Sequence, residues 1–180
     1  MENLKSCLYN LEFDEDTIEE ILELIDNEID IKELYEKIVY LQELGCDSRI
    51  IRIIIEENFL FFTTELEDIK KVVNFIKERD LKEYIVNIIE VNPDIISISI
   101  DTLKKNENLL KMTLSEDKVR ILLRDRTEVF TYNSDYLADR LAFFIKNGLK
   151  EHLDDILLTQ TELLDLEENE IEIEKLKKKS

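Results

Sequence analysis

The sequence predicts an all-α protein, a right-handed-type helical-repeat solenoid whose units of about 34 residues each hold two helices and a short terminating turn. The first observation is that a chain of 180 residues contains 2 glycines and 1 proline, so the residues that punctuate strands are scarce. The second is that apolar residues recur at helical spacing along most of the chain. The third is that this pattern returns at intervals close to 34 residues, which is typical of helical-repeat proteins.

The clearest unit spans residues 66–99. Two apolar runs at helical spacing predict its helices: Ile69, Val72, Val73 and Ile76 for the first, then Leu81, Ile85, Ile88 and Ile89 for the second. Asp80 and Glu83 have capping-box spacing, so we expect the second helix to begin at Asp80. Pro93 cannot continue a helix and predicts the terminating turn, after which Ile95 and Ile96 supply apolar contacts.

Three further units, at residues 34–65, 100–133 and 134–167, repeat this pattern. The unit 34–65 aligns at an offset of 35, which matches Ile50, Ile53, Ile54 and Phe61 to Ile85, Ile88, Ile89 and Ile96. The unit 134–167 aligns at an offset of 68, twice 34, and the unit 100–133 needs a one-residue slip. Gly45 is predicted to end a first helix in the left-handed conformation, and Asp47 or Ser48 to cap the next helix. Thr64 and Glu67 have capping-box spacing before the central unit.

The two ends of the chain differ from these units. Residues 1–33 are expected to form a divergent acidic N-terminal repeat or cap, with a helix that begins at a Thr17–Glu20 capping box. The outward face of that helix is predicted to carry four acids, Glu19, Glu20, Glu23 and Asp26. Residues 168–180 form a block of acids followed by lysines, for which we expect a frayed helix or disorder.

The chain is strongly acidic. Its formal net charge is −19, and residues 1–33 contribute more than half of that excess. Such a charge repels phosphate backbones at long range and disfavours non-specific binding of nucleic acid. No signal peptide and no apolar run of about 20 residues is present, so we expect a soluble cytoplasmic protein without membrane contact. The composition, rich in Ile, Leu, Lys, Glu and Asn, favours a bacterial origin.

The turns and endings of the units resemble a known repeat. The turns read YLQELGC, FIKERDL and FIKNGL, and the endings read NFLFF, NPDIIS and QTELLDL. Residues 34–166 thereby resemble the repeat of the mitochondrial transcription termination factor (mTERF) family. The resemblance implies a curved helical solenoid that binds nucleic acid on its concave face.

Residues with catalytic or metal-binding patterns are scarce. His152 is the one histidine of the chain, and no glycine-rich phosphate loop or nucleophile motif is present. Cys7 and Cys46 lie within apolar patterns, where buried reduced thiols are expected. We therefore expect no catalytic residue, no cofactor, no metal site and no enzymatic activity.

Two hypotheses for function follow from these patterns. The favoured one is a non-catalytic interaction protein whose partner is a basic or nucleic-acid-binding protein, one version being acidic mimicry of nucleic acid through Glu19, Glu20, Glu23 and Asp26. The alternative is an mTERF-like nucleic-acid-binding protein. Its candidate basic track consists of Arg49, Arg52, Lys118, Arg120, Arg124 and Arg126, with Tyr132 and Tyr136 available to stack on bases. In so acidic a chain, however, we expect these cations to pair with acids on neighbouring repeats. A domain that only holds other domains together is a third alternative.

Overall fold

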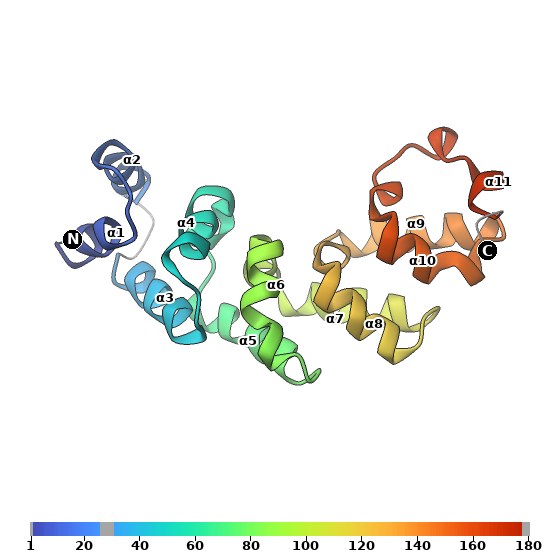
Figure 1. Cartoon of the computed structure of the whole chain (residues 1–180), viewed down its shortest axis with the longest axis horizontal. Coiled ribbons are helices and arrows are strands. Elements are labelled where there is room, and N and C mark those ends of the chain that lie inside the picture. Colours follow the sequence, from blue (N-terminus) through green and yellow to red (C-terminus); the bar gives the residue numbers. More distant parts are fainter. Residues whose placement is uncertain (1, 26–30, 178–180) are drawn as a thin grey trace. The chain divides into compact units, whose positions relative to one another are not determined.

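The computed structural model describes residues 2–25 and 31–177, and this part of the chain consists of helices joined by turns, with no strand (Figure 1). The predicted all-α class is confirmed. The chain divides into two compact units, Met1–Ser97 and Ile98–Ser180, and each is described by itself. The division falls beside the predicted boundary between the second and third repeats.

The first unit contains six α-helices and three short 3₁₀ helices within its described residues. The α-helices are α1 (Glu2–Asn10), α2 (Glu15–Ile25), α3 (Ile31–Leu44), α4 (Ser48–Glu57), α5 (Leu66–Lys77) and α6 (Ile85–Val91). The 3₁₀ helices are η1 (Phe59–Phe62), η2 (Lys82–Tyr84) and η3 (Pro93–Ser97). Helix α1 packs on α3, and α4 packs on α6.

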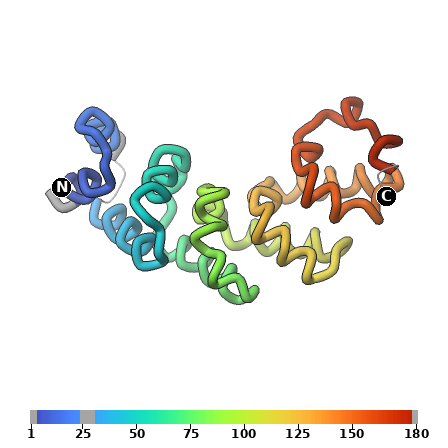
Figure 2. The backbone as a smooth tube through the Cα atoms, in the orientation of Figure 1, coloured from blue at the N-terminus to red at the C-terminus, as the bar shows by residue number. Residues whose placement is uncertain are grey.

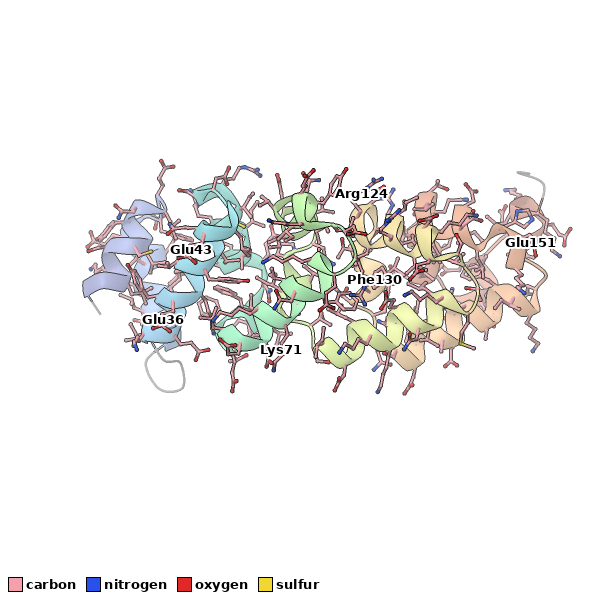
Figure 3. The ribbon with its side chains drawn as sticks, turned by 90° about the horizontal axis from the view of Figure 1, so that it is seen from below. Glu36, Glu43, Lys71, Arg124, Phe130 and Glu151 are labelled. Atoms are coloured by element: carbon pink, nitrogen blue, oxygen red, sulfur yellow. The ribbon has the colours of Figure 1, made fainter. Side chains whose placement is uncertain are left out.

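The second unit has the same alternation. Its α-helices are α7 (Ile100–Lys111), α8 (Glu116–Asp125), α9 (Ser134–Lys146), α10 (Leu153–Thr159) and α11 (Ile173–Leu176). Its 3₁₀ helices are η4 (Thr127–Phe130), η5 (Lys150–His152), η6 (Thr161–Leu164) and η7 (Glu168–Glu170). Phe130, labelled in Figure 3, is fully buried within this unit.

Each of the ranges 34–65, 66–99, 100–133 and 134–167 ends in a 3₁₀ helix, and these recur along the backbone tube of Figure 2. The same backbone hydrogen bond opens each of the four turns. Its acceptor is the carbonyl of the residue that ends the preceding α-helix: Asn58, Asn92, Arg126 or Gln160. These acceptors are spaced by 34 residues, which gives the structural register of the repeat. The unit boundaries themselves stay a prediction.

The second helices follow this 34-residue register, and the offset of 35 expected for them is wrong. Ile51, Ile54 and Ile55 of α4 are buried and correspond to Ile85, Ile88 and Ile89 of α6, whereas Ile53 is only half-buried. Phe62, not Phe61, therefore corresponds to Ile96. The offset changes in the turn, because five residues separate Gly45 from Ile51 but four separate Asp80 from Ile85.

Several predicted helix caps differ from the structure. Asp80 has a φ of 59°, so it adopts the left-handed conformation at the end of the turn that follows α5, and does not start a capping box; Gly45 adopts this conformation directly after α3. Asp14, rather than Thr17, caps α2 by accepting the Thr17 backbone N–H at 2.8 Å. The Thr64 hydroxyl donates to the Leu60 carbonyl and does not cap α5. The predicted cap at Asp47 is confirmed, because its carboxylate accepts the Ile50 N–H.

Buried polar side chains fasten three of the four terminating turns to the first helix of the same repeat. The Lys37 ammonium, 2% exposed, donates to the Phe61 and Phe62 carbonyls at 3.2 and 3.1 Å. The Asn106 amide donates to the Phe130 and Tyr132 carbonyls, and the Arg140 guanidinium to the Leu163 carbonyl. These bonds satisfy turn carbonyls that would otherwise be costly to bury. The apolar pattern did not indicate these bonds.

The C-terminal segment is ordered through Lys177, where we expected fraying or disorder. Ile171 and Leu176 are buried, so η7 and α11 pack against the rest of the second unit. Glu167 and Glu170 form a reciprocal capping box that starts η7. Two apolar contacts and this cap explain why the charge-rich segment folds.

Candidate binding surfaces

The acidic face of α2 is exposed as predicted for its described members. Glu19, Glu20 and Glu23 are exposed, and in the part of the chain that the structure describes they form no ion pair. Asp26 lies outside the described residues. Asp14 at the start of the helix is also anionic, because the Thr17 backbone N–H stabilises its carboxylate and lowers its pKa. The face therefore presents a row of uncompensated carboxylates.

The first unit holds two of the predicted track residues. The Arg49 guanidinium lies 2.6 Å from the Glu90 carboxylate, which joins α4 to α6. Arg52 pairs with Glu56 at 3.5 Å and lies over the Phe13 ring at 5.3 Å from its centroid. Both arginines line an open cavity of about 460 Å³ whose other walls are Glu12, Ser48, Ile53 and Glu56. This cavity is of mixed charge, so it is not a strongly cationic pocket.

The second unit holds the other four track residues, each bonded to an acceptor. Lys118 pairs with Asp154, and this contact lowers the pKa of the Asp154 carboxyl. Arg120 and Arg124 pair with Asp117 and Asp125 at 2.9 and 2.6 Å. The Arg126 Nε donates to the Leu158 carbonyl at 2.8 Å. The Arg124 side chain is labelled in Figure 3.

The six cations thus form local pairs rather than an unneutralised row. Two sit in one unit and four in the other, so each group is considered separately. Three of these bonds join successive repeats: Arg49 to Glu90, Lys118 to Asp154, and Arg126 to Leu158. Their evident role is to fasten neighbouring second helices to one another.

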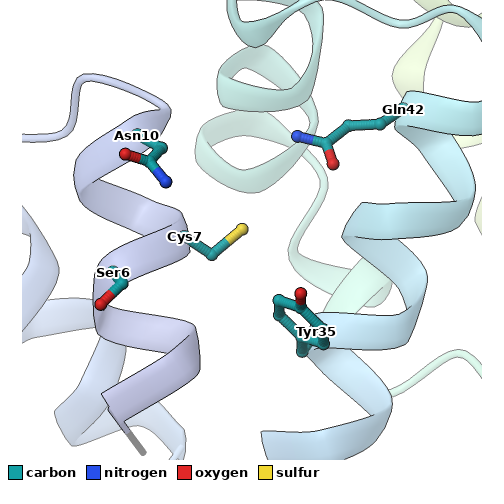
Figure 4. A pocket seen from close by; sticks show the side chains of 5 residues that line it. All are labelled: Ser6, Cys7, Asn10, Tyr35 and Gln42. Atoms are coloured by element: carbon teal, nitrogen blue, oxygen red, sulfur yellow. The ribbon is translucent and has the colours of Figure 1, made fainter.

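A second cavity, of about 340 Å³, lies between α1 and α3. It is lined by Ser6, Cys7, Asn10, Tyr35 and Gln42, and Figure 4 shows the Cys7 sulfur pointing from α1 toward α3. Burial raises the pKa of the Cys7 thiol, so the thiol is neutral and a poor nucleophile. The other cysteine, Cys46, is buried, and its pKa is raised to about 11 by burial and by Asp47.

Tyr132 and Tyr136, the tyrosines expected to be available for stacking, lie against each other, and Tyr136 is 40% exposed. Their rings lie 5.7 Å apart at 31°. The Tyr132 hydroxyl donates to Asp165 and the Tyr136 hydroxyl donates to the Leu164 carbonyl. Burial and this carboxylate raise the pKa of Tyr132. Both residues tie α9 and its preceding turn to the end of the last repeat.

Over residues 2–25 and 31–177, no group of three His, Cys, Asp or Glu side chains has the geometry to hold a metal ion. His152 is half-buried at the end of η5. Within the same residues, no helix has the length and apolar character needed to cross a membrane.

Sequence reasoning missed one exposed apolar pair. Phe59 and Leu60 open η1 with exposed fractions of 69% and 53%. The offset of 35 aligned Leu60 with Ile95, which is buried, and so concealed the difference. The offset of 34 aligns Leu60 with Asp94, an exposed acid, and would have marked the pair as unusual.

Comparison with known families supports the resemblance seen in the turns. The mTERF family model matches residues 6–166, so the match also takes in α1 and α2. Comparison with curated proteins gave no match. The matched range contains all four helical pairs and their terminating turns. The chain therefore belongs to the mTERF family of helical-repeat proteins, whose members in general bind nucleic acids.

Proposed function

We propose that this chain is a non-catalytic binding protein and that its partner is the basic surface of another protein. One observation carries the proposal: all six track cations already bond to carboxylates or carbonyls, whereas Glu19, Glu20 and Glu23 are exposed and form no ion pair within the described residues. Of the two candidate surfaces, the acidic face of α2 is therefore the one whose charges are not already paired.

The magnitudes show which electrostatic effect matters more. An exposed ion pair contributes at most about 1 kcal/mol, so the existing pairs of the arginines would by themselves weaken phosphate binding only slightly. Long-range repulsion of phosphate is the larger effect, because the whole chain has 43 acidic residues and 24 basic ones. The same field attracts a basic protein and accelerates its association.

A direct test uses a fluorescent peptide rich in lysine and arginine and measures its binding by anisotropy. The variant Glu19→Gln/Glu20→Gln/Glu23→Gln is expected to weaken binding about tenfold, since three surface charges at about 0.5 kcal/mol each give about that ratio. The matched control neutralises three exposed acids elsewhere, Glu151, Asp155 and Glu162. Equal weakening by both variants would show a general charge effect and remove the α2 face as the site.

Acidic mimicry of nucleic acid is a narrower version of this proposal. It requires the α2 carboxylates to occupy the phosphate sites of a DNA- or RNA-binding protein. Displacement of a duplex from a DNA-binding domain by this chain would support it, provided that the α2 variant no longer displaces the duplex.

Binding of nucleic acid is the second candidate, favoured by the family to which the chain belongs. Its test measures anisotropy of mixed single- and double-stranded DNA and RNA probes across a salt series. If this candidate is right, binding weakens steeply with salt, and Arg120→Glu with Arg124→Glu weakens it further and flattens the salt slope. Absence of binding at low salt would eliminate it.

A further inference from the structure

We propose that Phe59 and Leu60, hereafter the η1 patch, are the apolar anchor site for the basic protein partner. The inference rests on the proposed function and adds to it the place and chemistry of the contact. The partner segment it predicts carries apolar side chains flanked by lysine or arginine.

Leu60 differs in kind from the residues at its position in the other repeats. The carbonyl of Leu60 accepts the Thr63 N–H, as the carbonyls of Glu128 and Glu162 accept the corresponding N–H groups of the third and fourth repeats. Asp94 has this place in the second repeat. Three repeats thus put an acid where the turn faces solvent, and the first puts a leucine that is 53% exposed. The fold does not require an apolar residue here.

Phe59 shows the same departure. The corresponding positions hold Pro93, Thr127 and Thr161. Thr127 and Thr161 are buried, and their hydroxyls donate to the Leu123 and Leu157 carbonyls at 3.0 and 3.1 Å. A phenyl ring makes no such bond, and Phe59 stays 69% exposed with its ring centroid 6.3 Å from that of Phe62. Exposed aromatic rings with fixed positions are common anchors in protein interfaces.

The backbone that presents the η1 patch is held from two sides. The Lys37 ammonium bonds the Phe61 and Phe62 carbonyls from α3. Asn58 accepts the Phe61 N–H and donates to the Pro93 carbonyl of the next repeat. The two apolar side chains therefore project from an ordered turn, which lowers the entropic cost of binding.

The surroundings of the η1 patch indicate the charge of its partner. Glu57 and Glu56, the latter paired with Arg52, are exposed in the last turn of α4, and Asn58 alone separates them from the patch. Asp94 is exposed in η3, which packs against η1, and Val91 at the end of α6 is 58% exposed. An apolar centre bordered by carboxylates complements an apolar segment flanked by cations. A second copy of this chain is a poor occupant, because each copy carries a charge of −19.

The test uses the full chain and two fluorescent peptides of equal positive charge. One peptide contains leucine and phenylalanine between its lysines, and the other has serine in their place. The patch variant Phe59→Thr/Leu60→Glu copies residue types that other repeats hold there, so its fold should be retained; circular dichroism and thermal unfolding check this. The control variant is Met112→Glu, which alters an apolar side chain that is 79% exposed in the second unit.

Wild-type protein is expected to bind the apolar peptide about tenfold more tightly than the serine peptide, and the patch variant is expected to lose this difference while Met112→Glu keeps it. Equal binding of both peptides by the wild type would overturn the inference and leave the proposed function standing. Failure of the wild type to bind either peptide would contradict both the inference and the proposed function. Sedimentation velocity adds one outcome: self-association abolished by the patch variant would assign the η1 patch to a second copy.

Discussion

Two successive repeats of the first unit, residues 34–65 and 66–99, build the same backbone with different polar contacts. In the first, Lys37 of α3 bonds the carbonyls of its own terminating turn. In the second, Val72 of α5 occupies the position that corresponds to Lys37; it is fully buried, and its side chain has no hydrogen-bond donor group. There, Asn58 of the preceding repeat bonds the Pro93 carbonyl and the Ser97 hydroxyl, each at 2.9 Å.

The two turns therefore receive side-chain hydrogen bonds from different elements and at different carbonyls, those of Phe61 and Phe62 in the first repeat and that of Pro93 in the second. A 3₁₀ turn leaves carbonyls without intrahelical partners, and burying them unsatisfied is costly. The first repeat meets this need from within, and the second meets it from its neighbour. Each repeat is therefore stabilised partly by local bonds and partly by the interface between repeats.

The largest effect is expected from Lys37→Val, which gives the first repeat the residue of the second. The Phe61 and Phe62 carbonyls lose a charged donor while staying buried, so the free energy of unfolding should fall by about 2–4 kcal/mol. Urea unfolding followed by circular dichroism measures this loss.

The matched control is Lys71→Val, which removes a lysine from the exposed side of α5. Its pair with Asp68 is a surface ion pair, so the loss should stay under about 1 kcal/mol. Similar losses for the two variants would mean that the buried ammonium is not an anchor.

An intermediate effect is expected from Asn58→Ala, which removes the donor supplied across the repeat interface. Asn58 is fully buried and makes bonds to Pro93, to Ser97 and from the Phe61 N–H. Its loss should cost about 2 kcal/mol in urea unfolding, since each neutral bond contributes about 1 kcal/mol or less.

Asn92→Ala provides the comparison for this change, because Asn92 stands at the same position one repeat later. Its side-chain nitrogen is buried and has no hydrogen-bond partner among residues 2–25 and 31–177. Removing it should therefore cost clearly less than removing Asn58. A larger cost at Asn92 would contradict the assignment of the anchoring role to Asn58.

The apolar periodicity was sufficient to predict the all-α class and the helical-repeat pattern, because buried positions such as Ile69, Ile76, Ile88 and Ile89 recur at fixed spacing. It was insufficient for the turns, where single residues decide the register. The change of offset between Gly45 and Ile51 depends on one residue in a loop, and isoleucines at five of six consecutive positions from Ile50 satisfied either alignment.

The candidate surfaces were less predictable than the fold. The charge pattern correctly indicated exposed acids at Glu19, Glu20 and Glu23. The expected pairing of track cations with acids on neighbouring repeats is confirmed for Arg49 and Lys118, although the sequence did not identify Glu90 and Asp154 as the partners, since that depends on how neighbouring helices stack. Lys37 escaped notice because a lysine at helical spacing is ordinarily solvated, and only the structure shows its ammonium among carbonyls.

The smallest effect is expected where the first helices of the two repeats end. Gly45 follows α3 with a φ of 100°, whereas Asp80, in the turn after α5, has a φ of 59°, a conformation that costs a side-chain-bearing residue more than glycine. Asp80→Gly should therefore raise the free energy of unfolding by about 0.5 kcal/mol, partly offset by the greater freedom of glycine in the unfolded chain. Thermal and urea unfolding measure the change, and Gly45→Asp provides the reverse exchange, expected to lower stability because its φ lies further from the range that aspartate tolerates. Destabilisation by Asp80→Gly would show that the Asp80 side chain contributes to the turn, and the two repeats would then differ in how α3 and α5 end as well as in how their terminating turns are held.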